Sequence, residues 1–183
     1  MFQPTRRQLL IAAAAATAVP AFAADAPIRI TTGFTAGGTT DVIARLVALH
    51  LGQKLGRTII VENRPGASGN IAAQFVSKAA SDGNNLLLAP SSHATNASLY
   101  KRMPFDTEKD FTAIGMVATT PYVLVVHPQI PAKSVSELIA LLKSQPDRFN
   151  YASSSPGTGQ HLAAELFKKM ADVDMTQVPY KGS

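Results

Sequence analysis

The order of short strands and helices between residues 28 and 89 constrains the fold most. A β-rich segment, 28–34, precedes a helical pattern over 39–55. A second strand pattern at 58–61 is followed by a helical pattern over 70–80 and by a uniformly apolar strand at 86–89. This alternation, with a strand apolar on both faces, is typical of a parallel sheet covered by helices on both sides. The chain is therefore expected to be α/β, with a doubly wound sheet in its first lobe.

The first helix is expected to bury the stripe formed by Val42, Leu46 and Leu49, which recur at helical spacing. Either Thr39 or Thr40 can act as its N-cap, because a hydroxyl oxygen there can accept a hydrogen bond from the first turn. The 39–55 helix should therefore pack on the sheet with this stripe.

A second alternation begins after a polar connector at 104–110 and an apolar, β-branched stretch at 114–126. Ser134 and Glu137 form a capping-box pattern at the start of a helix. The expected elements of this part are a helix over 134–144, a strand at 149–152, a helix over 160–170 with Leu162, Leu166 and Met170 on one stripe, and a strand from 178. The predicted domains are a signal peptide (1–23), a first lobe (24–120) and the start of a second lobe (121–183).

The N-terminus has the order of a secretory signal. Arg6 and Arg7 precede an apolar run at 9–19, and Ala21-Phe22-Ala23 provides an A-x-A cleavage site. The paired arginines also resemble a twin-arginine signal. We expect cleavage after Ala23 and a periplasmic mature protein.

Composition excludes several function classes. Loss of Arg6 and Arg7 with the signal leaves 15 basic and 12 acidic residues, a net charge of +3, and no basic run interleaved with aromatics suggests nucleic-acid binding. The chain has no cysteine, so thiolate chemistry is excluded. Its four histidines have no metal-ligand spacing, and we expect neither a metal nor a cofactor.

No enzyme motif is present in the regions where one would be expected. Gly66-Ala67-Ser68-Gly69 does not have the G-x-S-x-G spacing, and residues 33–38 do not have the G-x-G-x-x-G spacing. Ser92 and His93 are neighbours in sequence, an arrangement that rarely gives nucleophile–base geometry. We therefore expect a binding protein rather than an enzyme.

Two loops of small residues, 35–40 and 153–159, each lie between a predicted strand and a predicted helix. Backbone N–H groups at a helix start attract anions, and such loops lie at the carboxyl ends of strands, where α/β proteins bind ligands. A third loop, 90–96, contains His93, which could donate to a ligand carboxylate or hold a structural hydrogen bond. A structural role is favoured for His161.

Several blocks of the sequence resemble the Bug-type solute-binding proteins of tripartite tricarboxylate transporters. The most specific are E-N-R-P-G-A-S-G-N at 62–70 and V-P-Y-K-G at 178–182. The matches keep the family order and comprise Pro27 to Ile30, Phe34 to Asp41, Val61 to Asn70, Ser98 to Tyr100, Phe105 with Asp106, Asp110 with Phe111, Asn150 to Ser153, Gly157 with Thr158, His161 to Ala163, and Val178 to Gly182.

The resemblance implies a two-lobed periplasmic-binding-protein fold (type 2, flytrap) whose second lobe is incomplete here. It implies a monomer that captures a di- or tricarboxylate, an acidic amino acid or an aromatic acid and delivers it to the membrane subunits of the transporter. The candidate ligand-binding residues are Phe34, Thr35, Ala36, Gly37, Gly38, Thr39, Asp41, Ser92, His93, Ser153, Ser154, Ser155, Thr158 and His161.

Two departures from the family pattern affect this expectation. Many relatives have Ser or Thr where this chain has Gly159 and Gln160, so ligand specificity cannot be transferred. Relatives also continue past the V-P-Y-K-G block, at which this sequence ends, and residues 1–183 alone are expected to bind poorly. A sensing receptor that docks on a signalling partner is the alternative to a transport receptor, and an exported hydrolase is a third reading without positive support.

Overall fold

Three parallel strands form the sheet of the first lobe in this computed structural model, which describes residues 26–180 and 182. They are β1 (Ile28–Thr32), β2 (Ile59–Asn63) and β3 (Asn85–Leu88), in the order β2-β1-β3. The central β1 is therefore paired on both sides, which confirms the expected parallel sheet. The predicted signal peptide lies outside the described residues.

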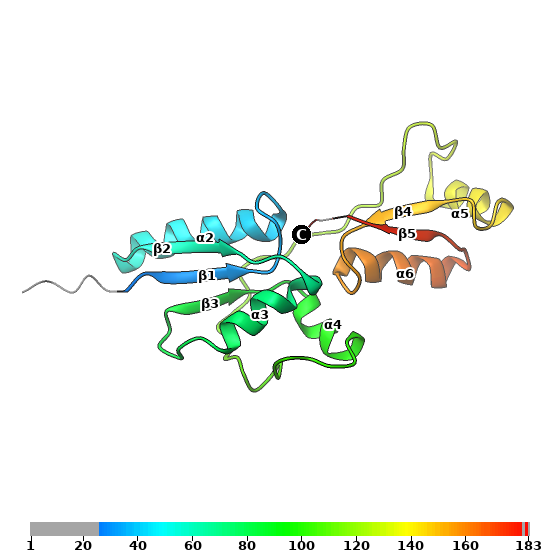
Figure 1. Ribbon diagram of the computed structural model, residues 1–183. Coiled ribbons are helices and arrows are strands. Elements are labelled where there is room, and N and C mark those ends of the chain that lie inside the picture. Colours follow the sequence, from blue (N-terminus) through cyan, green and yellow to red (C-terminus); the bar gives the residue numbers. More distant parts are fainter. Residues whose placement is uncertain (1–25, 181, 183) are drawn as a thin grey trace, which may run out of the picture.

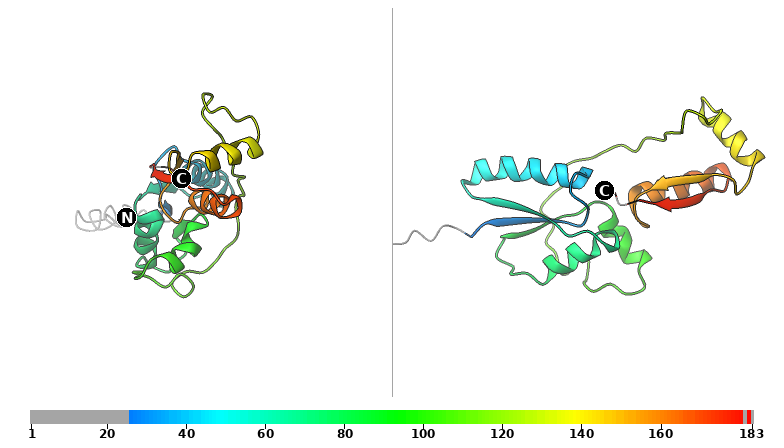
Figure 2. Two further views of the ribbon diagram at one scale, coloured as in Figure 1. Left: turned by 90° about the vertical axis from the view of Figure 1, so that its right-hand side faces the viewer. Right: turned by 45° about the horizontal axis from the view of Figure 1, so that its top comes forward.

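Helices cover both faces of this sheet, as Figures 1 and 2 show. The helix α2 (Thr39–Leu55) packs on β1 and β2 from one side, and α3 (Asn70–Ser77) packs on β3 and β1 from the other. A short 3-10 turn, η1 (Ala67–Gly69), precedes α3. This arrangement is the doubly wound lobe expected from the sequence, and β1, at its centre, ends where the strand order reverses.

The face that α2 buries differs from the expected one. Ala44 and Ala48 pack with Ile30 in the core, whereas Val42 and Leu46 are 58% and 55% exposed. The prediction was wrong because Ala44 and Ala48 also recur at helical spacing, so spacing alone does not decide which stripe faces the sheet. The rotation of α2 is instead fixed at its first turn, where buried Asp41 is bound to Asn63 of β2.

The N-cap of α2 is also different from the expected one. It is Gly38, and it makes no side-chain hydrogen bond to the helix. Thr39 and Thr40 are the first two residues of the helix rather than its cap. The first N–H groups of α2 therefore have no hydroxyl covering them.

A further helix, α4 (Ser92–Leu99), replaces most of the loop predicted at 90–96. Its buried residues are the polar Ser92 and Asn96, both of which donate to the carbonyl of Ser68. Because polar contacts rather than an apolar stripe hold α4 against the first lobe, hydrophobic periodicity gave no signal for it.

Residues 100–134 connect the two lobes without a helix or strand. The predicted β-branched stretch lies extended in this connection, and Ile114, Val123 and Val125 are 83%, 76% and 79% exposed. The predicted domain boundary at residues 120 and 121 falls within this stretch and stays a prediction.

The second lobe contains two helices and two parallel strands. They are α5 (Val135–Ser144), β4 (Asn150–Ser153), α6 (Gly159–Ala171) and β5 (Thr176–Pro179). The predicted cap of α5 is confirmed, since the Ser134 hydroxyl accepts from the Glu137 N–H at 3.2 Å.

The stripe predicted on α6 is not buried. Leu166 and Met170 are 57% and 78% exposed, because α6 turns its polar residues Glu165 and Lys168 toward the strands. Across the described residues, no helix combines the length and the apolar character that a membrane crossing requires.

Candidate functional site

The loop between β1 and α2 is held from behind by Asp41. The Gly37 N–H donates to Asp41 Oδ2 at 2.9 Å, and Arg45 Nε donates to the same oxygen at 3.0 Å. Asn63 Nδ2 donates to Asp41 Oδ1 at 2.9 Å and to the carbonyl of Phe34 at 3.2 Å. These contacts fix both ends of the loop to α2 and β2.

Asp41 is charged over the whole physiological range. The side-chain hydrogen bond from Arg45, then the N–H of Gly37 and the amide of Asn63, lower the pKa of the Asp41 carboxyl from 3.8 to about 2. Both carboxylate oxygens are occupied by these donors. The geometry therefore gives Asp41 the role of supporting the loop, and a direct ligand contact of this residue stays a prediction.

The outer part of the same loop is open. Ala36, Gly37 and Thr39 are exposed, Thr35 and Gly38 are half-buried, and Phe34 is buried beneath them. The uncapped N-terminus of α2 opens at this loop, so its N–H groups and the positive end of the helix dipole are accessible to an anion. The six predicted residues 34–39 thus form one continuous segment at the carboxyl end of β1.

The second predicted loop, between β4 and α6, is tied together by its own hydroxyls. Ser154 Oγ donates to Thr158 Oγ1 at 2.9 Å, and Thr158 Oγ1 donates to the carbonyl of Ser155 at 2.8 Å. Ser153 Oγ accepts from Gln177 of β5 at 2.8 Å. Ser153, Ser154 and Thr158 are buried, and Ser155 is half-buried.

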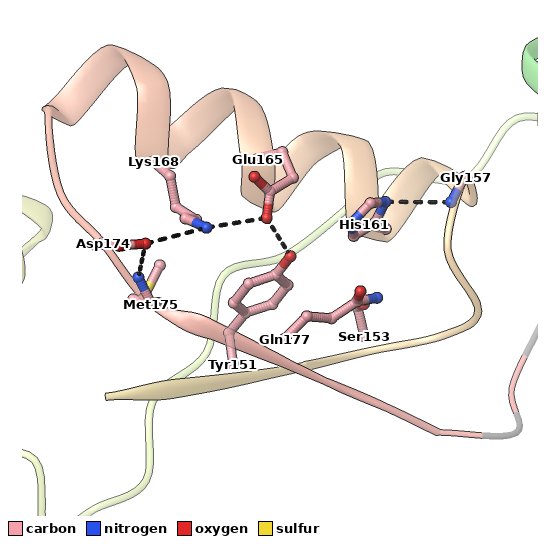
Figure 3. A network of polar contacts seen from close by, with 9 residues as sticks. All are labelled: Tyr151, Ser153, Gly157, His161, Glu165, Lys168, Asp174, Met175 and Gln177. Carbon is pink, nitrogen blue, oxygen red and sulfur yellow. Dashed lines mark hydrogen bonds and ion pairs between the residues drawn. The ribbon is translucent and has the colours of Figure 1, made fainter. Parts of the chain in front are cut away.

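His161 serves this loop from the first turn of α6. Its Nδ1 accepts from the Gly157 N–H at 3.1 Å, as Figure 3 shows. This contact fixes the tight turn at Gly157, whose φ is +83°. The structural role favoured for His161 is the one this geometry supports.

Ser92 and His93 lie at the start of α4 and line a small cavity together with Phe34 and Gly69. The His93 ring stacks on Phe105 with centroids 5.7 Å apart and meets Phe111 edge-on at 4.9 Å. Burial lowers the pKa of His93. The ring is packed among aromatics, which favours the structural alternative for this residue.

The two lobes touch at a point that the sequence reasoning did not select. Ser68 Oγ of η1 donates to the carbonyl of Pro156 at 2.6 Å, and Thr95 Oγ1 of α4 donates to the carbonyl of Gly157 at 2.9 Å. The signal available in the sequence was the pair of glycines around Ala67 and Ser68, which indicates an unusual turn. The partners are 88 and 62 residues away, beyond the reach of any local pattern.

Tyr122 was also not predicted. A side chain at Gly159 would collide with the Tyr122 hydroxyl, so this hydroxyl lies directly over the start of α6. The glycine that departs from the family pattern is thus matched by a tyrosine from the connection between the lobes. Among the residues that the structure describes, no cluster of His, Asp or Glu could hold a metal ion.

Comparison with known proteins identifies the family. The sequence model of the family described as tripartite tricarboxylate transporter family receptor matches residues 43–183. A UPF0065 protein and the protein BugT, both from Bordetella pertussis, are each 38% identical to the chain, over 85% and 86% of its length. The chain spans about half of these relatives, 48% and 49%.

Solved structures agree with this assignment. Rpa4515 of R. palustris, solved with adipate, is 41% identical with a TM-score of 0.81 over 85% of this chain and 52% of that one. MatC from Rhodopseudomonas palustris, solved with malate, is 31% identical with a TM-score of 0.77, over 85% and 53%. The periplasmic binding protein BugD is 31% identical with a TM-score of 0.73, over 85% and 52%.

These matches confirm the resemblance, the flytrap fold with an incomplete second lobe, and the expectation of a receptor family rather than an enzyme family. The chain belongs to the tripartite tricarboxylate transporter receptor family.

Proposed function

We propose that this chain is part of a periplasmic receptor that captures a small carboxylate for a tripartite tricarboxylate transporter. The observation that carries the proposal is the uncapped N-terminus of α2 behind an exposed glycine loop, at the carboxyl end of the central strand. Backbone N–H groups there suit a carboxylate without supplying a countercharge. Arg45, bound to Asp41, neutralises the acid behind the loop.

The second loop provides a facing wall in this proposal. Residues 153–158 lie at the start of α6, whose N-cap, Thr158, makes no side-chain hydrogen bond to the helix. A ligand with two carboxylates could place one against each helix start. The adipate in Rpa4515 and the malate in MatC are both dicarboxylates, which supports this class of ligand.

The test is calorimetric titration of the protein in its full natural length with adipate, malate and their dimethyl esters. We expect the acids to bind and the esters, which lack the negative charges, to show no measurable binding. Equal binding of acids and esters would contradict carboxylate recognition.

The site itself can be tested at Gly38. Its backbone has φ −75° and ψ 168°, which a β-branched residue adopts readily. We therefore expect Gly38→Val to fold normally and to abolish binding, because the isopropyl group covers the helix start. Unchanged affinity of a folded Gly38→Val variant would show that the ligand does not bind at this loop.

Delivery to a transporter can be separated from sensing by measurement. Deletion of the gene should abolish uptake of the bound acid, and the liganded receptor should co-purify with the transporter's membrane subunits. Normal uptake together with a lost transcriptional response to the acid would instead support the sensing alternative.

A further inference from the structure

The contact between η1, α4 and the loop before α6 has features that a chance encounter of two surfaces does not have. It consists of two hydrogen bonds, from Ser68 to the carbonyl of Pro156 and from Thr95 to that of Gly157. Ser68 is only 4% exposed, so the contact is shielded from solvent on the first-lobe side. Both acceptors are neighbouring carbonyls of one tight turn.

The first-lobe side of the contact is built in a backbone conformation that costs free energy. Residues 66–69 all have positive φ, including +46° at Ala67 and +55° at Ser68. Such conformations of non-glycine residues persist where the surroundings over-determine them. The surroundings here are strong, because Ser92 and Asn96 of α4 both donate to the carbonyl of Ser68.

A close approach of backbone completes the arrangement. At Gly157 an added Cβ would lie 2.7 Å from Leu99 Cδ1 and 3.2 Å from Asn96 Oδ1 of α4. Asn96 is fully buried, and its Oδ1 has no partner among the described residues. Only glycine allows the second lobe to come this near to α4.

We propose that Ser68, Thr95 and the turn at Pro156 and Gly157 form a latch that holds the two lobes closed and so slows ligand release. Ser68 and Thr95 are positioning residues, since their hydroxyls contact carbonyls of the 153–158 loop, the second wall of the proposed site, and not the ligand itself. The ligand-release part rests on the proposed function, whereas the closing of the lobes does not. The strained turn at Ser68 is the fixed half of the latch, and the glycine turn of the second lobe is the mobile half.

The latch is tested first without ligand. Because the chain has no cysteine, Lys78→Cys and Lys169→Cys allow one spin label on each lobe, and pulsed electron resonance then reports the distance between the lobes. We expect Thr95→Val to lower the closed-to-open ratio about fivefold, the effect of one lost hydrogen bond between the lobes. We expect Ser68→Ala to lower it at least as much, although this variant also loses the hydrogen bond that the Tyr100 hydroxyl donates to Ser68 Oγ within the first lobe. Ser77→Ala, which removes a hydroxyl bound within α3, is the matched control and should leave the distances unchanged.

A steric arm guards against variants that only lose stability. Gly157→Ala should open the lobes, both because a side chain is strained at φ +83° and because its methyl group clashes with Leu99. Leu99→Ala added to it removes the clash and should partly restore closure. Circular dichroism of every variant establishes folding. Native distance distributions in folded Thr95→Val, Ser68→Ala and Gly157→Ala variants would overturn the latch.

The ligand arm uses the protein in its full natural length with adipate or malate. We expect stopped-flow release to be about fivefold faster in Thr95→Val, with an unchanged association rate. Unchanged release in a variant whose lobes have opened would overturn the effect on ligand retention. Failure of the native protein to bind either acid would refute the proposed function and leave the distance measurement as the test of the latch.

Discussion

Asp41 lies behind the loop that is proposed to bind an anion, so its negative charge would repel the proposed ligand. Three donors, from Gly37, Arg45 and Asn63, consume its two oxygens. The carboxylate thereby fixes the loop from behind, and the guanidinium of Arg45 compensates its charge. A neutral side chain could not bind all three donors as strongly.

The pKa of Asp41 predicts a pH dependence of stability. Because the folded pKa lies at about 2, below the ordinary 3.8, the stabilisation is present above pH 4 and is lost as the pH falls from 4 to 2. We expect the urea midpoint of the native chain to fall over this interval, and that of Asp41→Asn to be lower above pH 4 and to fall less.

The control for this measurement is Asp172→Asn, at the end of α6 in the other lobe. It should have the native pH profile. An identical fall in the Asp41→Asn variant would mean that other carboxyl groups cause the acid sensitivity.

Single residues also show how far sequence reasoning reached into the site. Residues 34–39 and 153–158 were predicted as candidates because small residues before a helix carry local chemistry, and their contact with a ligand stays a prediction. Ser68 and Thr95 were missed because their role depends on carbonyls in another lobe. The Asp41 contacts with Asn63 required the register of β2, which no spacing along the chain reveals.

Among the elements, β4, β5 and α6 are joined by a network of polar contacts, which Figure 3 shows. Tyr151 of β4 donates to Glu165 of α6 at 2.6 Å. Lys168 bridges Glu165 and Asp174, at 3.2 and 3.3 Å, and so reaches the start of β5. No residue of α6 is fully buried, so these polar contacts help the half-buried Leu162 and Phe167 to hold the helix on the strands.

The ionisation of the Tyr151 hydroxyl tests whether this polar network forms. Burial, and then the hydrogen bond to Glu165, raise the pKa of Tyr151 above its ordinary value of 10.0. In an alkaline absorbance titration we expect one of the four tyrosines to ionise last, and Tyr151→Phe to remove that phase. The variant should also lose about 1 to 2 kcal/mol of stability in urea.

The control for this experiment is Tyr180→Phe, at an exposed tyrosine after β5. It should leave the last phase and the urea midpoint unchanged. A late phase that survives in Tyr151→Phe would show that the polar network is not formed.

The elements themselves were largely predictable. Alternating patterns gave every described strand and all the described α-helices except α4, with ends displaced by at most three residues. The buried faces of α2 and α6 were not predictable, because each helix is oriented by polar contacts, at Asn63 and at Tyr151. The helix α4 was not found at all, because its buried residues are Ser92 and Asn96.

At the scale of the whole molecule, the connection between the lobes is its most exposed apolar segment. Residues 114–126 run extended and carry side chains such as Val123 and Val125 outside any sheet. Figure 2 shows this connection running from the first lobe to the second, and neither sheet includes any of its residues. An extended apolar segment with free backbone groups can pair with a second copy of itself.

We expect residues 24–183 to self-associate through this segment. The double variant Val123→Lys and Val125→Lys should self-associate less. Sedimentation velocity over a range of protein concentrations measures it. The matched control is Val42→Lys, at an exposed valine whose backbone is bonded within α2. An equal reduction in the control would assign the association to apolar side chains in general.

Among the residues that the structure describes, the same connection is the single covalent passage between the lobes, since β1 to α4 precede it and α5 to β5 follow it. Lobe closure is therefore a unimolecular event that dilution does not change, whereas association between copies disappears on dilution. A tether of this kind gives the two halves an effective concentration on the order of millimolar. At that effective concentration, two hydrogen bonds and the close approach at Gly157 suffice to populate the closed arrangement of the lobes. The same contacts are weak enough for the lobes to open again.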